Sequence, residues 1–380
     1  MIRILQCVNN MHRAGLETML MNYYRSLDKS RIQFDFLTHR PFKSDYDDEI
    51  ESLGGKVYYA PRLTPQNYPQ NFSYMKKFFH DHPEYKIIHS HIDSMSYLPL
   101  LSAKRAGVPI RIAHSHNISI DLDYKYPLKS FFRTRLDSVA TDFAACGKEA
   151  GEFLFKSKST KIIPNAINAD EFIFSEKVRK EKRQELGITD EFIIGHIGRF
   201  SQQKNHSFLL EIFAEIKKLN QSALLFLIGT GENEDKIKEK AEKLGIKSSV
   251  RFLGVRSDVE SLYQAFDIFL LPSLYEGVPV VGIEAQFASL PCIFSNRVPK
   301  ETAFTNNCEF LDLTLPAKKW AEKAISLGGV PRRREEFFDS EYRIENTADK
   351  LEKYYIDLLK IYKENKNDKK QETTARSIAR

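Results

Sequence analysis

The chain has 380 residues, more than one ordinary domain holds, so two domains are the expectation. Hydrophobic residues make up 42% of the chain and aromatic residues 12%, which is enough for packed cores and excludes a wholly disordered protein. The net charge of +6 is modest, and because no basic-aromatic sequence module accompanies it, the composition argues against a nucleic-acid partner. An anionic ligand or an anionic membrane face fits this charge better.

The cysteines and the N-terminus indicate a cytoplasmic protein. The four cysteines are scattered and form no Cys-x-x-Cys pair, which argues against a disulfide framework and against a zinc site. Residues 1–8 are too short an apolar run for a signal peptide and predict a first buried strand. No apolar run approaches the roughly 20 residues of a membrane span. We therefore expect a soluble or peripheral protein.

In the first half, apolar runs alternate with segments of helical periodicity, the pattern of a parallel α/β sheet. The predicted strands are Ile2–Val8, Phe34–Leu37, Lys56–Tyr59, Ile87–His89, Ile110–His114 and Asp142–Cys146. The predicted helices include Leu16–Leu27, Tyr74–His82 and Ser96–Ala106. Residues 165–168 predict a turn, and the charged residues 172–186 predict a helix or a linker.

A second alternating series follows. Its predicted strands are Phe192–Ile197, Ala223–Ile228, Val250–Leu253, Ile268–Leu271 and Cys292–Phe294. Its predicted helices are Ser207–Leu219, Glu232–Leu244, Val259–Ala265 and Val280–Ala288. Neither half has Gly-x-Gly-x-x-Gly after its first strand, and Glu234 stands where Gly229-Thr230-Gly231 would need a third glycine, so a dehydrogenase is disfavoured. Residues 340–364 predict an amphipathic helix, and the charged residues 365–380 predict a disordered tail.

The loops after the second-half strands carry the candidate binding residues, because open α/β sheets bind ligands at the carboxyl ends of their strands. Gly198 allows close backbone approach, and Arg199 and Lys204 are two cations on one loop that suit a leaving diphosphate. A solvated surface pair is the competing interpretation. Gly229 follows the next strand, where a simple turn is the favoured interpretation unless a ligand passes close.

Two further loops belong to this set. Val255 and Arg256 follow another strand and could meet a nucleotide base, although a helix-entry turn is as plausible, and Asp258 reads as the cap of the next helix. Glu276 and Glu284 flank a loop with a Gly and a Pro that runs into an apolar helix. Pro279 suits the first helical position, and the amides that follow would form an anion site. Eight residues along a helix span about 12 Å, too far for one metal ion but suited to an extended ligand.

These loops form an ordered set: Gly-Arg-x₄-Lys-Asn, Ile-Gly-Thr-Gly-Glu, Phe-Leu-Gly and Glu-Gly-x-Pro-x₄-Glu. The set resembles the retaining glycosyltransferases of the GT-B fold, family 4 type, over nearly the whole chain. Short segments of the first half, such as residues 111–117 and 145–150, resemble the bacterial exopolysaccharide and capsular polysaccharide branch.

The resemblance implies an α/β fold of two Rossmann-like domains with parallel sheets that face a central cleft, and a C-terminal helix that crosses back to the N-terminal domain. The acceptor-binding domain would be residues 1–168, completed by the helix at about 340–364. The domain that binds the nucleotide sugar would be residues 169–339. Residues 365–380 would lie outside both.

The resemblance also implies site residues. Arg199 and Lys204 would bind the donor diphosphate, Glu276 would lie by the donor sugar, and Glu284 would bind the ribose. The amides of Gly277 and Val278, before Pro279, would lie near sugar or phosphate, and Val255 or Arg256 would meet the base. Gly198 and Gly229 would line the donor.

In the first half, Gly15 occupies the place of the family's glycine-rich loop, with Ala14 in place of the usual first glycine, and would permit a positive φ. His116 or His114 matches the family's sugar-contacting histidine; His116 is nearer the loop and is preferred. With His89 and His91 these make four neighbouring histidines, but a metal is not expected, since the family needs none and no carboxylate partner is evident.

Four further segments are not assigned to the donor site. Asp121-Leu122-Asp123 is read as an exposed acceptor-side loop and not as a manganese site. Residues 165–168, and Ser289-Leu290-Pro291 with its missing glycine, depart from the family pattern and are expected to lie away from the chemistry. The basic-aromatic residues 124–133 either contact a membrane or start a plain helix with a buried Phe pair.

The expected function is retaining transfer of a sugar from a nucleotide diphosphate sugar, by family habit a UDP-sugar, to a lipid-linked exopolysaccharide or capsule oligosaccharide. The resemblance implies no cofactor and no metal. It places the enzyme in the cytoplasm, at the inner face of the membrane. The alternatives are a nucleotide-sugar epimerase or phosphorylase of GT-B architecture, and a non-catalytic sugar-nucleotide-binding subunit of a polysaccharide assembly complex.

Overall fold

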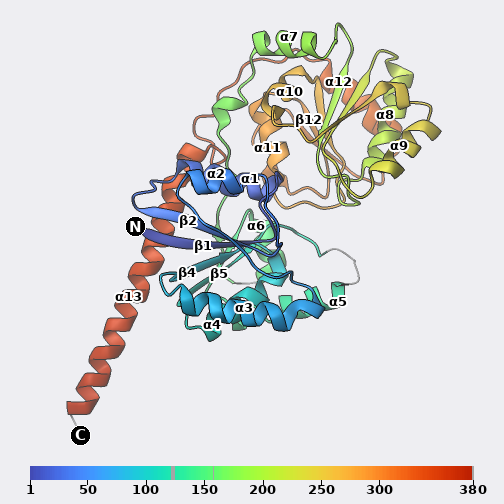
Figure 1. Ribbon diagram of the computed structural model, residues 1–380. Helices are drawn as coiled ribbons and strands as arrows, with labels where there is room; N and C mark the ends of the chain where they lie inside the picture. The colour runs from blue at the N-terminus through green and yellow to red at the C-terminus, as the bar shows by residue number, and fades with distance from the viewer. Residues whose placement is uncertain (121–124, 157, 379–380) are drawn as a thin grey trace. The chain divides into compact units, whose positions relative to one another are not determined.

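The chain forms two compact units. The computed structural model describes residues 1–120, 125–156 and 158–378. The N-terminal unit comprises residues 1–164 and 344–380, and the C-terminal unit comprises residues 165–343 (Figure 1). The two divisions between the units, after residues 164 and 343, lie within a few residues of the predicted ones, whereas the N-terminal unit extends to residue 380, beyond the predicted end at about 364.

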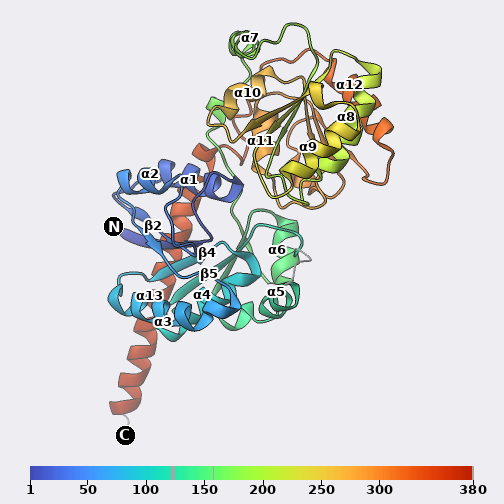
Figure 2. The ribbon, with the colours of Figure 1, turned by 45° about the vertical axis from the view of Figure 1, so that its right-hand side comes forward.

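The N-terminal unit is built on a seven-stranded parallel sheet of order β3-β2-β1-β4-β5-β6-β7. Its strands are β1 (Ile2–Val8), β2 (Ile32–Thr38), β3 (Val57–Tyr59), β4 (Ile87–Ser90), β5 (Ile110–Ser115), β6 (Asp142–Ala145) and β7 (Lys161–Ile162). Its α-helices are α1 (Gly15–Ser26), α2 (Asp47–Ser52), α3 (Tyr68–Asp81), α4 (Tyr97–Arg105), α5 (Tyr126–Arg133), α6 (Lys148–Phe155) and α13 (Ala348–Ile378). Helices α1 and α2 cover one face of the sheet, and α3 and α4 cover the other (Figures 1 and 2).

The C-terminal unit repeats this architecture with a six-stranded parallel sheet of order β10-β9-β8-β11-β12-β13. Its strands are β8 (Ile193–Ile197), β9 (Leu224–Ile228), β10 (Val250–Gly254), β11 (Ile268–Leu271), β12 (Cys292–Ser295) and β13 (Cys308–Leu311). Its α-helices are α7 (Glu176–Glu185), α8 (His206–Leu219), α9 (Glu234–Lys243), α10 (Val259–Ala265), α11 (Val280–Phe287) and α12 (Ala317–Gly328).

Short 3₁₀ helices connect several of these elements. They are η1 (Pro65–Asn67), η2 (Asp93–Ser96), η3 (Leu136–Ser138), η4 (Ala169–Glu171), η5 (Lys247–Ser249), η6 (Lys300–Thr302) and η7 (Ile344–Asn346).

In each sheet the strand order reverses once. The reversal lies between β1 and β4 in the N-terminal unit and between β8 and β11 in the C-terminal unit. The loops that leave two such strands diverge to opposite faces of the sheet, which opens a crevice at the carboxyl edge where ligands bind. The topology therefore marks the loops after these four strands as the candidate site.

All eleven predicted strands are present within about two residues of their predicted ends. The prediction missed β7 and β13, which lie at sheet edges and are not fully buried, so they lack a strong apolar run. The prediction did not name α2 or α6 and missed α12, whereas α5 confirms the helix that was one of two interpretations of residues 124–133. Helix α3 begins six residues before its predicted start, with a Pro in its first turn.

The C-terminal helix packs on the N-terminal unit through Tyr355, whose ring lies edge-on to Phe34 at 6.0 Å between centroids. The helix starts at Ala348, later than predicted, because residues before it form η7. It continues to Ile378, so the segment from residue 365 that composition predicts to be disordered is helical. Lys, Glu and Gln are good helix formers, which accounts for the extension. No helix among the described residues is long and apolar enough to cross a membrane.

Arginines cap the carboxyl end of α10. Arg332 donates to the main-chain oxygens of Tyr263, Gln264 and Phe266 at 3.1, 2.9 and 3.0 Å. Arg179 of α7 donates to the oxygens of Gln264, Ala265 and Phe266. The last carbonyls of a helix have no intrahelical donor and carry partial negative charge, so the partly buried guanidinium groups of these arginines suit them. They fix the helix that carries Tyr263.

Helix α11 ends in a Schellman motif with an unusual residue. The amide of Leu290 donates to Ala285 O at 3.0 Å and that of Ser289 to Gln286 O at 2.9 Å. This motif requires a left-handed residue, normally glycine, and Ser289 occupies it with φ 51°. Its hydroxyl is buried and has no hydrogen-bond partner among the described residues. A glycine at this position would adopt the left-handed conformation without the cost that the Cβ of Ser289 imposes.

Replacing Ser289 by glycine is expected to raise the free energy of unfolding by about 1–2 kcal/mol, because the left-handed conformation costs a Cβ-bearing residue about that much. Removal of the unpartnered hydroxyl adds to the gain. Ser289→Ala is the matched control, since it removes the hydroxyl and keeps the Cβ. Denaturant unfolding should rank the glycine variant above the alanine variant; equal stability of the two would contradict the conformational argument.

Candidate active site

Three loops at the carboxyl edge of the C-terminal sheet are joined by main-chain hydrogen bonds. Each of these hydrogen bonds links two residues that lie at the ends of neighbouring strands or shortly after them. The bonds are Gly198 N to Ile228 O at 2.9 Å, Phe200 N to Thr230 O at 2.9 Å, and Gly229 N to Gly254 O at 2.8 Å. The loops after β8 and β9 and the end of β10 therefore form one connected surface.

The backbones of Gly198 and Gly229 lie unusually close. Gly229 has φ +124°, and a Cβ there would lie 2.3 Å from Gly198 O. Any side chain would force the loops apart. At Gly231 a Cβ would lie 2.7 Å from Phe200 N and O. The sequence favoured a simple turn at Gly229; the structure shows that glycine there serves loop-to-loop packing.

Lys204 and Glu276 form a largely buried ion pair. Lys204 Nζ lies 2.6 Å from Glu276 Oε1, and the two side chains are 15% and 7% exposed. Gln203 Nε2 donates to Tyr275 O at 3.0 Å and to Glu276 Oε2 at 3.3 Å. The pair joins the loop after β8 to the loop after β11, across the reversal of strand order.

Arg199 has a different environment from Lys204, although the sequence grouped the two cations. Its side chain is 74% exposed, and Arg199 Nη2 lies 3.0 Å from Oε2 of the half-exposed Glu232. An exposed pair of this kind contributes little to stability and is readily exchanged for another anion. Arg199 is therefore the more available of the two cations.

The two glutamates do not share a helix. Glu276 lies in the loop, and α11 begins at Val280 with Pro279 as its N-cap, so Pro279 is not the first helical residue and the spacing of about 12 Å along a helix does not apply. Glu284 lies within α11 and accepts a hydrogen bond from Tyr263 Oη at 2.8 Å. Burial raises the pKa of Glu284 to about 7.

The turn at residues 165–168 was expected to lie away from the chemistry, and this expectation is wrong. Asn165 Nδ2 donates to Val278 O at 2.5 Å, directly between Gly277 and Pro279. Asn165 is 7% exposed. It is a supporting residue that the sequence analysis missed, because the contact joins segments more than a hundred residues apart.

Asp258 stands at the N-cap position of α10 but its carboxylate binds cations instead of capping the helix. Arg256 donates to both of its oxygens at 2.7 Å, and Lys182 Nζ lies 2.9 Å away. These cations, Arg256 first, hold the pKa of Asp258 well below its ordinary value. Val255 is 59% exposed. Val255 therefore offers an open apolar side chain, while the Arg256 guanidinium is already engaged.

In the N-terminal unit, Gly15 is the first residue of α1, and the described residues with positive φ do not include it. The predicted use of Gly15 for a positive φ is thus wrong, although its lack of a side chain still leaves the start of the helix open. Two residues on, Glu17 is buried, and burial raises its pKa to about 7. The sequence analysis assigned Glu17 no role.

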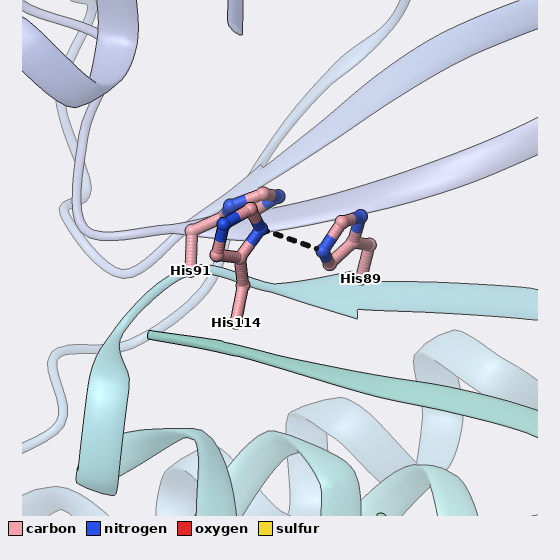
Figure 3. Close-up of side chains that lie close together, drawn as sticks. All are labelled: His89, His91 and His114. Carbon is pink, nitrogen blue, oxygen red and sulfur yellow. Dashed lines mark hydrogen bonds between the residues drawn. The ribbon is translucent and has the colours of Figure 1, made fainter. Parts of the chain in front are cut away.

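The four histidines gather at the ends of β4 and β5. His89 Nε2 lies 3.0 Å from His114 Nδ1 (Figure 3), and His91 Nδ1 lies 3.0 Å from His116 Nε2. His89, His91 and His114 are buried, whereas His116 is partly exposed. Burial lowers the pKa of His116 to about 3 and those of the other three well below 6.5. The structure thus makes His116, rather than His114, the more accessible ring.

One ring nitrogen from each of His89, His91 and His114 lies within 4.8 Å of the others, and neutral imidazoles are ligands that zinc accepts. Among the described residues this is the one group with metal-ligand proximity. Its nitrogens, however, are largely taken by hydrogen bonds within the cluster and to neighbours.

Two segments of the acceptor-side prediction remain. Asp121-Leu122-Asp123 lies outside the described residues. Of the Phe pair on α5 that was predicted to be buried, Phe132 is buried but Phe131 is 51% exposed. Tyr126, on the same helix, is 41% exposed. Helix α5 therefore presents aromatic side chains to its surroundings beside Lys125 and Lys129.

Comparison with known proteins agrees with this arrangement. The family model "Glycosyltransferase Family 4" matches residues 13–171, and "Glycosyl transferases group 1" matches residues 178–308. EpsF of Bacillus subtilis, a protein assigned as a glycosyltransferase, is 37% identical over 88% of this chain and 90% of its own length. CapH of Staphylococcus aureus, a capsular polysaccharide biosynthesis glycosyltransferase, is 25% identical over 94% of this chain and 99% of its own.

Among solved structures, Anabaena HepE in complex with UDP-glucose superposes with a TM-score of 0.73 at 17% identity, over 93% of this chain and 94% of that one. The likeness shows that the fold is shared. Together with the identity to EpsF over most of both chains, it establishes that this chain belongs to glycosyltransferase family 4, the group 1 glycosyltransferases of GT-B fold.

Proposed function

We propose that this glycosyltransferase transfers a sugar, with retention of anomeric configuration, from a UDP-sugar to a growing exopolysaccharide or capsule saccharide. The observation that carries the proposal is the buried Lys204–Glu276 pair at the carboxyl edge of the C-terminal sheet. It places a cation and a carboxylate side by side, one suited to a diphosphate and the other to sugar hydroxyls.

In the proposed reaction the donor diphosphate takes up negative charge as it leaves. Arg199, Lys204 and the amides at the start of α11 would hold that charge, as fixed cations and dipoles do in other transfer reactions. The acceptor hydroxyl would attack on the face from which the leaving group departs. The departing phosphate would accept its proton, so no protein nucleophile is needed.

The remaining site residues would hold the donor along its length. Glu276, the amides of Gly277 and Val278, and His116 would contact the sugar. Glu284 would bind the ribose by accepting hydrogen bonds from its hydroxyls; burial raises the pKa of Glu284 to about 7, so the carboxylate form prevails above that pH.

The other predicted ligand contacts are carried by main chain and by small residues. Val255 and the main chain at Arg256 would meet the base, because the Arg256 side chain is engaged by Asp258. Gly15, Gly198, Gly229 and Pro279 would line the donor, and His114 would stay behind His116.

HepE with bound UDP-glucose supports a uridine nucleotide, and the capsular relative CapH supports a polysaccharide acceptor. A lipid-linked acceptor is supported by α5, whose exposed Tyr126 and Phe131 lie beside lysines. Such a surface suits peripheral contact with the inner face of the cytoplasmic membrane.

The test is release of free nucleotide from a panel of sugar nucleotides, with and without a lipid-linked saccharide extract. Release that depends on the extract, and appears with a UDP-sugar, is the expected result. Sugar isomerisation without an acceptor would indicate an epimerase. Tight nucleotide binding without turnover on any acceptor would indicate a non-catalytic subunit.

Arg199→Ala is expected to lower kcat/KM on the order of 10²-fold to 10³-fold, the usual effect of removing one group that stabilises a developing negative charge. Because Arg199 is largely exposed, the unfolding midpoint should not change. Steady-state kinetics and thermal unfolding measure the two effects. Glu232→Ala is the matched control, which removes the partner of Arg199 and should retain activity; a normal rate in Arg199→Ala would refute its role.

Lys204→Ala is expected to lower both activity and stability, in contrast to Arg199→Ala. It leaves the buried Glu276 carboxylate unpaired, which costs about 3–5 kcal/mol. Adding Glu276→Gln removes that charge and should restore most of the stability but not the activity. Denaturant unfolding alongside kinetics separates the effects, and a double variant as unstable as Lys204→Ala would show that the pair is not the cause.

Glu284→Gln is expected to weaken UDP binding by at least about tenfold, because it removes a charged acceptor of hydrogen bonds. It should also change the pH dependence of stability. The pKa of Glu284 is 4.5 ordinarily and about 7 in the folded chain. The free energy of unfolding therefore falls by up to about 3 kcal/mol as the pH rises through that window. The glutamine variant lacks this loss.

The difference in melting temperature between Glu284→Gln and the wild type should therefore grow from pH 5 to pH 7 and then level off. Calorimetric titration with UDP and thermal unfolding across pH provide the two measurements. Parallel pH curves for both proteins would show that the carboxyl is not buried as described.

A further inference from the structure

The histidine cluster continues into a chain of hydrogen bonds that ends on the C-terminal helix. Each member contacts the next through one pair of polar atoms. The pairs are His116 Nε2 with His91 Nδ1 at 3.0 Å, His91 Nε2 with Gln6 Oε1 at 2.8 Å, Gln6 Nε2 with Tyr355 Oη at 3.3 Å, Tyr355 Oη with His89 Nδ1 at 2.7 Å, and His89 Nε2 with His114 Nδ1 at 3.0 Å. Residues from β1, β4, β5 and α13, and from the loops after β4 and β5, thus form one connected path.

Each imidazole in this chain is neutral near pH 7, since burial lowers the pKa of all four. A neutral imidazole carries a single N–H and offers a single lone pair. Each ring can therefore donate on one side only and must accept on the other. As a result, the position of one proton determines the position of the next.

Gln6 fixes the direction of the chain, because its amide has one end that only accepts and one that only donates. Gln6 Oε1 accepts from His91, so the His91 proton lies on Nε2 and its Nδ1 must accept. His116 therefore donates through Nε2. The lone pair of His116 is left on Nδ1.

The other half of the chain follows the same rule. Gln6 Nε2 donates to Tyr355 Oη, whose own proton has His89 Nδ1 as its acceptor. His89 then donates through Nε2 to His114. The chain ends at His114 Nε2, which is buried and has no partner among the described residues. A half-turn of the Gln6 amide would reverse every donor, because the Tyr355 hydroxyl can equally donate to Gln6 and accept from His89. The tautomers of His91 and His116 therefore report the orientation of the Gln6 amide.

The backbone at His116 is held separately. Its amide donates to Asp93 Oδ1 at 2.8 Å, and Asn117 Nδ2 donates to Asp93 Oδ2 at 2.9 Å. Asp93 itself adopts φ 45°. The loop position of His116 is thus set by Asp93, and the chain of hydrogen bonds is left to set its ring.

We propose that the chain from Tyr355 through Gln6 and His91 holds His116 as the Nε2–H tautomer, so that its Nδ1 is a hydrogen-bond acceptor for a hydroxyl group of the bound sugar. Gln6, His91 and Tyr355 are then positioning residues that act through His116. This inference rests on the proposed contact between His116 and the donor sugar. A neutral acceptor nitrogen orients a hydroxyl without adding positive charge near the reacting centre.

A metal centre is the competing use of the same residues. It would require the lone pairs of His89, His91 and His114 to converge on one point. The rings of His89 and His114 are instead nearly parallel, at 15°, and lie 3.0 Å apart between ring nitrogens, which is a hydrogen-bond distance. Both nitrogens of His91 already have partners. The contacts favour the hydrogen-bonded chain.

The decisive experiment is two-bond ¹⁵N–¹H NMR on the full-length protein with ¹⁵N-labelled histidine near pH 7. We expect neutral Nε2–H tautomers for both His116 and His91, assigned through single substitutions. A His116 in the Nδ1–H or charged form overturns the proposal. So does stoichiometric binding of added Zn²⁺ with loss of this tautomer pattern. This readout does not depend on transfer activity, so it stays decisive even if the proposed function fails.

The kinetic test uses Gln6→Met, which removes both polar ends of the Gln6 side chain. We expect a mixture of His116 tautomers and a fall in kcat of about tenfold, the equivalent of about one hydrogen bond, with KM for the nucleotide sugar little changed. Gln33→Met is the matched control: Gln33 is also a buried glutamine, on the neighbouring strand β2, bonded to Tyr24 and the carbonyl of Leu53.

Gln33→Met should cost stability without changing the His116 tautomer or kcat. If Gln6→Met fails to fold, Tyr355→Phe serves in its place, since it removes the acceptor of Gln6 Nε2 together with the hydroxyl partner of His89 Nδ1; the same mixture of tautomers is expected. Wild-type tautomers and kcat in a folded Gln6→Met or Tyr355→Phe protein would overturn the proposal.

Discussion

The ion pair of Lys204 and Glu276 is the interaction on which the C-terminal unit's site depends. It joins the loops after β8 and β11, the two strands between which the order of the sheet reverses. A parallel sheet opens a crevice at that point because successive connections leave to opposite faces. A largely buried pair across the crevice holds both loops at a fixed distance and leaves a cation and a carboxylate ready for a polar ligand.

The neighbouring loops are held by backbone contacts instead of charges. The backbones of Gly198 and Gly229 approach so closely that a side chain at Gly229 would collide with Gly198. The hydrogen bond from Gly229 to Gly254 extends this contact to β10. Glycine in these loops therefore serves the rigidity of the site, not the flexibility that its conformational freedom might suggest. Arg199 is exposed on this rigid surface, where an anionic ligand can displace Glu232.

Burial shifts the pKa values of acids and of bases in opposite directions. It raises the pKa of Glu17 and Glu284 toward 7, and it keeps the four histidines of the N-terminal unit neutral. Each group is thereby poised for hydrogen bonding rather than for carrying charge. The same geometric reversal, between β1 and β4, places Gln6 beside His91.

The alternation of apolar runs and helical periods was sufficient to predict two parallel α/β units, nearly all of their long strands and the loops that carry Arg199, Lys204 and Glu276, because these patterns are local and repeat with fixed periods. Short edge strands such as β7 escaped it because they bury little. Contacts between distant segments lay beyond it altogether: the pairing of Lys204 with Glu276, the bond from Asn165 to Val278, and the path from Tyr355 to His116. Which side chains are buried, and which partner each then finds, depends on how the chain packs in three dimensions, and no local period carries that information.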